Sequence, residues 1–189
     1  MTEPYSEFRV RILLFAETRS EAPDTVHALG RRMHALKVAA RRTSLGKPYI
    51  PGTGCFGYSD CNRMQGYFFS NKKYVGMDLE DSQRPDLRVR QRSLHAVVSR
   101  IDLASADFLP LWVAKESSAK AMGIGMRDGL KKLTLLEAPR PLGDSESVFH
   151  LGYAGQRMES RVRVLGKHLM AISYLSRYGV PDIRCSLYS

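Results

Sequence analysis

Two histidines, His27 and His34, stand two turns apart in a segment with the spacing of an amphipathic helix. They lie on a flank of its apolar stripe, which consists of Val26, Leu29, Met33, Leu36 and Ala40. His34 has the cations Arg31, Arg32 and Lys37 as sequence neighbours. An imidazole among cations loses its proton more readily, which suits a general base at neutral pH. The competing interpretation is a half-buried packing residue.

Basic residues dominate the charge of this chain of 189 residues, in which 29 Lys and Arg oppose 19 Asp and Glu to give a formal charge of +10. Such an excess favours a polyanion, because binding releases the polyanion's counterions. The polar side of the predicted helix supplies part of this charge through Arg31, Arg32, Lys37, Arg41 and Arg42. A base for a 2′-hydroxyl and cations for a developing phosphorane are the minimum for metal-free RNA cleavage.

Other candidate RNA contacts are spread along the chain. Phosphate contacts are predicted for Arg84, Arg88, Arg90 and Arg92 in a polar stretch, for Lys47, and for Arg157, Arg161 and Arg163. Bases could stack on the aromatic residues Tyr49, Phe56, Tyr58, Tyr67 and Phe69. The alternatives are a solvated charge run and aromatic rings that pack under their own domain.

Several classes of protein are not supported by the sequence. Cys55 and Cys61 have no further close Cys or His pair to complete a zinc site, and no phosphate-binding glycine loop or GxSxG motif occurs. The apolar runs are too short to span a membrane, and the N-terminus has no signal-peptide core. We therefore expect a cytoplasmic protein with reduced thiols, no metal or other cofactor, and no membrane partner.

The first half predicts a strand at residues 8–15, the helix described above, and a loop or irregular strands at 46–66. A hairpin follows, in which residues 65–69 and 73–77 flank a turn around 70–72. Residues 83–92 then read as a basic linker or arm between a domain at 1–82 and a domain at 93–189.

The second half predicts strands at residues 94–103, 133–136, 148–153 and 182–188. Helices are expected from Ser105 or Asp107 to about Met122 and from Leu165 to Tyr178. Residues 161–165 alternate like a strand but could also open the last helix. The order β-α-β-β-α-β predicts a ferredoxin-like fold, and thus an α+β protein whose first half is a related or decorated β-α-hairpin.

Several segments together resemble the CRISPR-associated RAMP-type endoribonucleases that process repeat RNA. The segments are FRVRILLF with TVHALGRRMHAL, HAVVSRI, DSESVFHLGY and RYGV. The resemblance implies His34 as catalytic base, Ser145 or Ser147 as the group that positions the attacking hydroxyl, and Tyr178 as a further site residue. It also implies a repeat hairpin or single-stranded RNA as ligand and other subunits of a ribonucleoprotein effector complex as partners. The second half departs from the family, since its first helix carries only Lys115 and Lys120 as basic residues.

Three hypotheses remain open at this point. The first is an RNA-binding protein of a CRISPR system that cleaves precursor guide RNA without metal and keeps its product. The second is a non-catalytic nucleic-acid-binding or scaffold protein, such as a phage or plasmid component. The third is an assembly subunit whose basic face meets an acidic protein.

Overall fold

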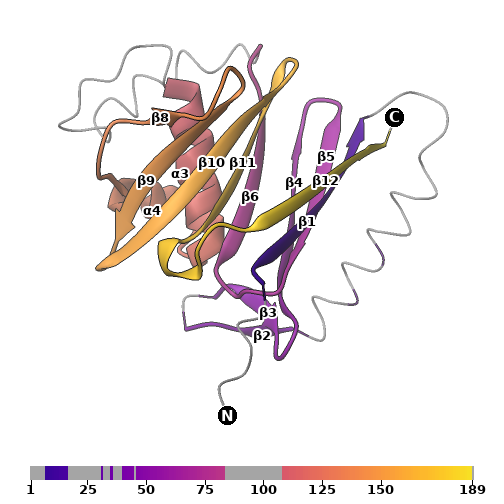
Figure 1. Ribbon diagram of the computed structural model, residues 1–189. Coiled ribbons are helices and arrows are strands. Elements are labelled where there is room, and N and C mark those ends of the chain that lie inside the picture. Colours follow the sequence, from indigo (N-terminus) through magenta and orange to yellow (C-terminus); the bar gives the residue numbers. More distant parts are fainter. Residues whose placement is uncertain are drawn as a thin grey trace.

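A computed structural model describes residues 7–16, 31, 35, 40–44, 46–83 and 108–188. The described chain is mixed α+β and mostly sheet. Sheet A has the strand order β12-β1-β5-β4-β3-β2, and sheet B has the order β6-β11-β10-β9-β7, with β8 paired to β9. Figure 1 shows the two sheets packed face to face, with α3 behind sheet B.

The bounds of the elements are as follows. In the first half they are β1 (Arg9–Ala16), β2 (Arg41–Arg42), β3 (Pro48–Ile50), β4 (Gly54–Cys61), β5 (Met64–Ser70) and β6 (Val75–Asp81). In the second half they are α3 (Phe108–Met122), α4 (Met126–Lys132), β7 (Thr134–Leu135), β8 (Arg140–Pro141), β9 (Glu146–Tyr153), β10 (Gln156–Leu165), β11 (His168–Leu175), the 3₁₀ turn η2 (Ser176–Tyr178) and β12 (Asp182–Tyr188).

Two apolar layers hold the elements together. Between the sheets, Ile12 and Phe68 of sheet A pack with Met77 and Ile172 of sheet B. On the other face of sheet B, α3 packs against residues such as Phe149 of β9. Burying these side chains is the main favourable term in folding. Sheet B therefore lies in the middle, and its strands β6 and β11 are covered on both faces.

The helix approaches sheet B closely because β6 contains Gly76. A Cβ atom at this position would lie 2.2 Å from the Ser117 carbonyl oxygen of α3. The next contact along β6 is polar, since the Lys120 ammonium donates to Asp78 Oδ1 at 2.5 Å and to Ser59 Oγ of β4 at 2.9 Å. Ser59 Oγ in turn donates to Asp78 Oδ1 at 2.9 Å, so this cluster joins both sheets to α3.

Several predicted elements are confirmed. The strand at 8–15, the helix that ends near Met122, the strand at 148–153 and the C-terminal strand match β1, α3, β9 and β12. Residues 161–165 belong to β10, which is the strand alternative. Irregular strands at 46–66 correspond to β3, β4 and the start of β5. The predicted helix around His34 and the strand at 94–103 lie outside the described residues, apart from isolated helical positions at Arg31 and Ala35.

The predicted hairpin of residues 65–77 is wrong. β5 pairs with β1 and β4, whereas β6 pairs with β11 in the other sheet. The connection is tied to the start of β1 instead of closing a turn, because Asn71 Oδ1 accepts from the Arg9 N–H and the Asn71 side-chain amide donates to the Glu7 carbonyl. Two neighbouring buried strands in the sequence thus enter different sheets.

The predicted helix from Leu165 to Tyr178 is also wrong. After a turn at Gly166, with φ of 60°, the chain returns as β11, which is buried at every position. A strand covered on both faces shows no polar alternation, so its apolar run resembles a buried helix. The described strands do not show the ferredoxin-like order.

The predicted linker at 83–92 lies outside the described residues except for Gln83. In each sheet, a strand that precedes this segment pairs with a strand that follows it, since β1 pairs with β12 and β6 pairs with β11. No helix in the described part of the chain is long and apolar enough to cross a membrane.

Candidate nucleic-acid interface

The outer face of sheet A, which points away from sheet B, carries a row of aromatic rings across four strands. Tyr188 of β12 stacks on Phe15 of β1 with ring centroids 5.0 Å apart. Phe15 meets Tyr67 of β5 edge-on at 6.0 Å, and Tyr67 meets Tyr58 of β4 at 6.3 Å. Aromatic rings from four strands, far apart in sequence, therefore form one continuous row.

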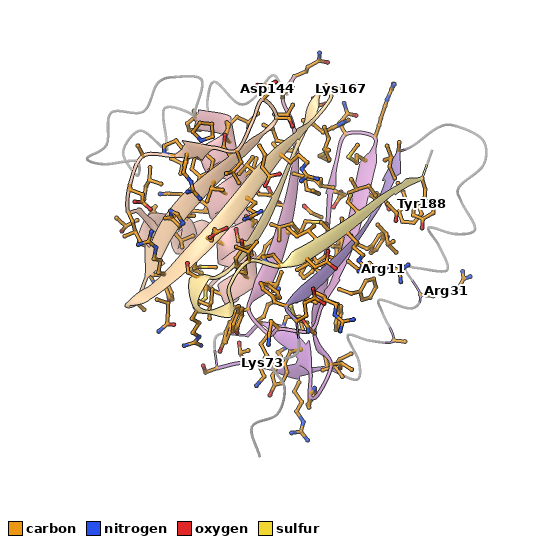
Figure 2. The ribbon with its side chains drawn as sticks, viewed as in Figure 1. Arg11, Arg31, Lys73, Asp144, Lys167 and Tyr188 are labelled. Atoms are coloured by element: carbon orange, nitrogen blue, oxygen red, sulfur yellow. The ribbon has the colours of Figure 1, made fainter. Side chains whose placement is uncertain are left out.

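The alternation of β1 explains why this face exists. Val10, Ile12 and Leu14 are buried between the sheets, whereas Arg9 and Arg11 are exposed. Because successive side chains of a strand point to opposite faces, Arg9, Arg11, Leu13 and Phe15 share the outer face. Figure 2 shows Arg11 and Tyr188 on the side of sheet A that is remote from sheet B.

A second row crosses the same four strands and consists of two arginines followed by two phenylalanines. Arg11 stands opposite Arg184 of β12 on one side and Phe69 of β5 on the other, and Phe69 stands opposite Phe56 of β4. A groove of about 730 Å³ crosses these strands and is lined by residues that include Arg9, Arg11, Leu13, Phe56, Phe69 and Tyr188. Cationic and aromatic side chains thus border the same concave surface.

Not all of these rings are equally accessible. The exposed fractions of Tyr58 and Tyr188 are 49% and 46%, whereas Phe15, Phe56 and Tyr67 are buried. Phe15 and Tyr67 therefore support the two exposed tyrosines at the ends of the row. Phe69 is half-buried within the groove. The accessible stacking surfaces are Tyr58, Phe69 and Tyr188.

Glycine at position 54 lets β4 lie close to β5 beneath the groove. Gly54 has φ of 104°, and a Cβ atom there would lie 1.9 Å from the Ser70 carbonyl oxygen. A side chain at this position would clash with the backbone and would be strained in that conformation. The groove depends on this glycine.

Most of the net positive charge of the described residues lies in sheet A and its connections. Residues 7–16, 40–44, 46–74 and 176–188, which form sheet A and its connections, hold 10 Lys or Arg against 3 Asp or Glu. Residues 75–83 and 108–175, which form sheet B and the helices, hold 10 Lys or Arg against 9 Asp or Glu. The layer that carries the aromatic row is therefore the layer that attracts a polyanion.

Three of the predicted phosphate contacts, all on β10, are instead paired with carboxylates of β9, of β10 and of the β7–β8 connection. Arg163 donates to Glu146 at 2.7 Å, and Arg157 donates to Glu137 at 2.7 Å. Arg161 donates to Glu159 at 3.1 Å. Three arginines and three glutamates compensate one another there, so this surface attracts a polyanion much less than sheet A does.

Glu159 is held ionised within this network. Burial raises the pKa of its carboxyl, but hydrogen bonds from Tyr174 and Arg161 outweigh burial and hold the pKa below its ordinary value. The Tyr174 hydroxyl donates to Glu159 at 2.5 Å. His150 also lies within contact of Glu137 and is 3.7 Å from Glu159. The network has the satisfied partners of a structural cluster.

The predicted catalytic residues are not brought together by the described residues. Ser145 lies beside Val164, whose N–H donates to the Ser145 carbonyl, and Ser147 stands opposite Val162 of β10. Tyr178 lies just beyond Leu175, the last residue of β11. Leu175 pairs with Met158, near the start of β10, whereas Ser145 and Ser147 lie near its end. Met158 and Val164 are six positions apart on β10, which corresponds to about 20 Å of strand. Figure 2 places Asp144, the neighbour of Ser145, at one end of sheet B, remote from the β11–β12 connection.

Tyr178 has a packing role where it stands. Its ring meets Phe8 edge-on at 5.7 Å, and burial raises the pKa of its hydroxyl. His34, the predicted base, lies outside the described residues.

The remaining predicted basic contacts divide into three groups. Arg31, Arg41 and Arg42 are exposed, and Arg42 also donates to the Gly46 carbonyl. Lys47 is buried, with an exposed fraction of 5%. The others lie outside the described residues: Arg32, Lys37, Arg84, Arg88, Arg90 and Arg92.

The aromatic prediction is refined by the structure, because four of the five residues lie on the outer face of sheet A. Tyr49 of β3 differs, since the Lys73 ammonium lies 4.3 Å from its ring centroid. Sequence reasoning missed Arg9, Arg11, Arg184 and Tyr188 as members of this surface. The alternation of arginine with apolar residues in β1 was the available signal.

The three cysteines are free thiols. Burial, and then the neighbouring Glu80 and Asp81 carboxylates, raise the pKa of Cys61 to about 12. Burial also raises the pKa of Cys55, whose Sγ donates to the Val75 carbonyl at 3.5 Å. Protonated thiols are poor nucleophiles and poor metal ligands. Among the described residues, no group of three or more His, Cys, Asp or Glu is placed to hold a metal ion.

No protein-family model matches the chain, and no curated protein matches its sequence. The chemistry of the outer face of sheet A is therefore the basis for inferring function.

Proposed function

We propose that this protein binds RNA, with a single-stranded segment lying across the outer face of sheet A. The observation that carries the proposal is the combination of exposed aromatic rings and an excess of basic over acidic residues on one concave sheet surface. Arg9 lies 3.7 Å from Glu7 and Arg184 donates to Asp182 at 3.0 Å, so Arg11 is the principal cation of the groove. Proteins that bind single strands stack bases on aromatic side chains and track the backbone with a basic groove. Four-stranded sheets in RNA-recognition modules stack two or three bases in this way.

The sequence resemblance favours RNA over DNA as the polyanion. It also suggests a CRISPR ribonucleoprotein effector complex as the setting, and hence a cytoplasmic protein. A repeat RNA offers both a hairpin and single-stranded flanks, and the flanks suit stacking because their bases are unpaired.

The experiment is a titration of the protein with labelled single-stranded RNA of about ten nucleotides, a length within the usual range for stacking grooves. Fluorescence anisotropy is measured at several concentrations between about 50 and 200 mM salt. We expect affinity for single-stranded RNA to exceed affinity for duplex RNA, and to fall steeply as salt increases. Binding that is equal for single strands and duplexes would contradict the stacking surface.

Cleavage of the bound RNA is a separate hypothesis. Ser145 or Ser147 and Tyr178 lie at opposite ends of sheet B, so they cannot serve one scissile phosphate in this conformation. This separation favours non-catalytic binding as the main role. Precursor guide-RNA processing then depends on His34 as the base, and the His34→Ala substitution tests it.

A further inference from the structure

A second pocket lies beside the groove, at the edge of sheet A that faces α3. Its volume is about 370 Å³, and its lining includes Lys47, Phe56, Tyr58, Asp60, Lys120 and Gly123. Phe56 also lines the larger groove, so the two hollows share this residue. A strand that crosses the outer face of sheet A could therefore enter the pocket.

The pocket opens along an unpaired stretch of β4. Among the described residues, β3 pairs with β4 at Gly54 and Cys55, and the following residues of β4 have no strand neighbour on that side. The backbone polar groups of such an edge are available to a ligand. A side chain at position 57 would clash with Phe68, because a Cβ atom there would lie 2.5 Å from the Phe68 ring.

Lys47 is the unusual residue of the pocket. It is 5% exposed, and its ammonium lies 5.2 Å from the centroid of the Phe68 ring. No carboxylate within the described part of the chain pairs with it, and the neighbouring Cys55 thiol is neutral because burial raises its pKa. Burying an amine without a counter-charge costs free energy, and the desolvation lowers the pKa of Lys47. A site of this kind gains an ion pair when an anion enters.

Lys120 provides a second cation at the pocket. Its ammonium is held by Asp78 and Ser59, and its side chain is 31% exposed. Asp60 is an acidic lining residue and is exposed. The buried end of the pocket thus presents Lys47, whereas the carboxylate of Asp60 is open to solvent.

We propose that this pocket binds the phosphate group of a nucleotide, with Lys47 as its principal ligand. The inference rests on the proposed function in one respect, namely that the nucleotide belongs to the RNA held on sheet A. A free mononucleotide offers the same chemistry, so the experiment includes both sources.

The test compares the Lys47→Met variant with wild-type protein. Methionine has a similar length without the charge, so we expect the variant to fold and to melt at the same or a higher temperature. Its affinity for single-stranded RNA should fall about ten- to a hundredfold, as expected when a charged hydrogen bond is lost. Lys115 is the matched control, because it is also buried but donates to the Leu130 carbonyl away from the pocket. The Lys115→Met variant should bind RNA as wild type does.

Uridine monophosphate is titrated in parallel, and the ε-carbon resonances of ¹³C-labelled lysine are followed by NMR. The Lys47 signal, assigned by its absence from the variant, should shift on addition of RNA or of uridine monophosphate. If the Lys47→Met variant binds single-stranded RNA with the affinity of the wild-type protein, this inference is overturned. The proposed function is then preserved. If the Lys47 signal shifts with uridine monophosphate but the protein does not bind RNA, the phosphate site in the pocket is supported. RNA is then refuted as the source of the phosphate group.

Discussion

The ring of Phe15 stacks on the ring of Tyr188, with centroids 5.0 Å apart and planes 14° from parallel. Phe15 is buried and Tyr188 is 46% exposed, so the buried ring fixes the orientation of an accessible one. The parallel pairing of β1 with β12 produces this stack, because it brings these two positions into register. The C-terminal strand thereby completes the aromatic row of sheet A.

Replacing Tyr188 with Ala should weaken binding of single-stranded RNA. Loss of a base–aromatic stack costs about 1–3 kcal/mol, which corresponds to roughly a 5- to 150-fold rise in Kd. The Tyr188→Phe variant keeps the ring and should retain most of the affinity. Anisotropy titrations of both variants test this expectation, and equal losses in the two would assign the effect to the hydroxyl group.

Arginine at position 11 should contribute one phosphate contact. The slope of log affinity against log salt concentration should become shallower by about 1 in the Arg11→Gln variant. Arg163→Gln is the matched control, because Arg163 is already paired with Glu146 at 2.7 Å on the other sheet. If the control changes the slope as much as Arg11→Gln does, the RNA extends over β10.

The Glu116 carboxyl of α3 should make stability depend on pH. Burial, followed by the nearby Asp78 carboxylate, raises the pKa of Glu116 to about 8 from an ordinary value of 4.5. The folded state therefore holds a proton that the unfolded state releases. This contribution is fully present below pH 4.5 and is lost as pH rises to about 8.

The Glu116→Gln variant mimics the protonated side chain and should be more stable than wild type at pH 8, by roughly 1–3 kcal/mol. The difference in Tm should narrow toward pH 5. Asp144→Asn is an exposed control with the same change of group and should show little difference at any pH. A gap for Glu116→Gln that is constant across the pH range would refute the proton linkage.

Cleavage by the protein, if the sequence resemblance extends to activity, should require His34 and no metal. We expect a repeat-hairpin RNA incubated with chelator to yield a cyclic-phosphate product with wild-type protein, and no product with the His34→Ala variant. Affinity of that variant for the RNA should be nearly unchanged. Cleavage that needs added magnesium would contradict the metal-free mechanism.

Elements that are marked by a pattern within their own segment were predicted correctly from the sequence. The alternation of β1, the apolar spacing of α3 and the turn-bounded run of β9 were all recognisable in the sequence. β11 was not recognisable as a strand, because it is buried at every position and therefore lacks a period of two. The start of β6 was predicted as a strand at residues 73–77, but with the wrong partner. The pairing of β6 with β11 also joins residues 75–81 to residues 168–174, and a single sequence carries little information about such distant partners.

The candidate site was predictable in composition but not in arrangement. The aromatic residues of β4 and β5 were identified as possible stacking groups, and the structure places them on one face. Their association with Arg11 and Tyr188 depends on the strand register, which the sequence does not reveal. The same limit applies to Arg163, because its pairing with Glu146 follows from the register of β9 and β10.

Ultraviolet crosslinking of a bound uridine-rich RNA, with the crosslinked peptides identified by mass spectrometry, tests the central claim most directly. We predict crosslinks in peptides that contain Tyr58, Phe69 and Tyr188 of sheet A. Crosslinks confined to β9 and β10 of sheet B would contradict the assignment of the RNA-binding surface.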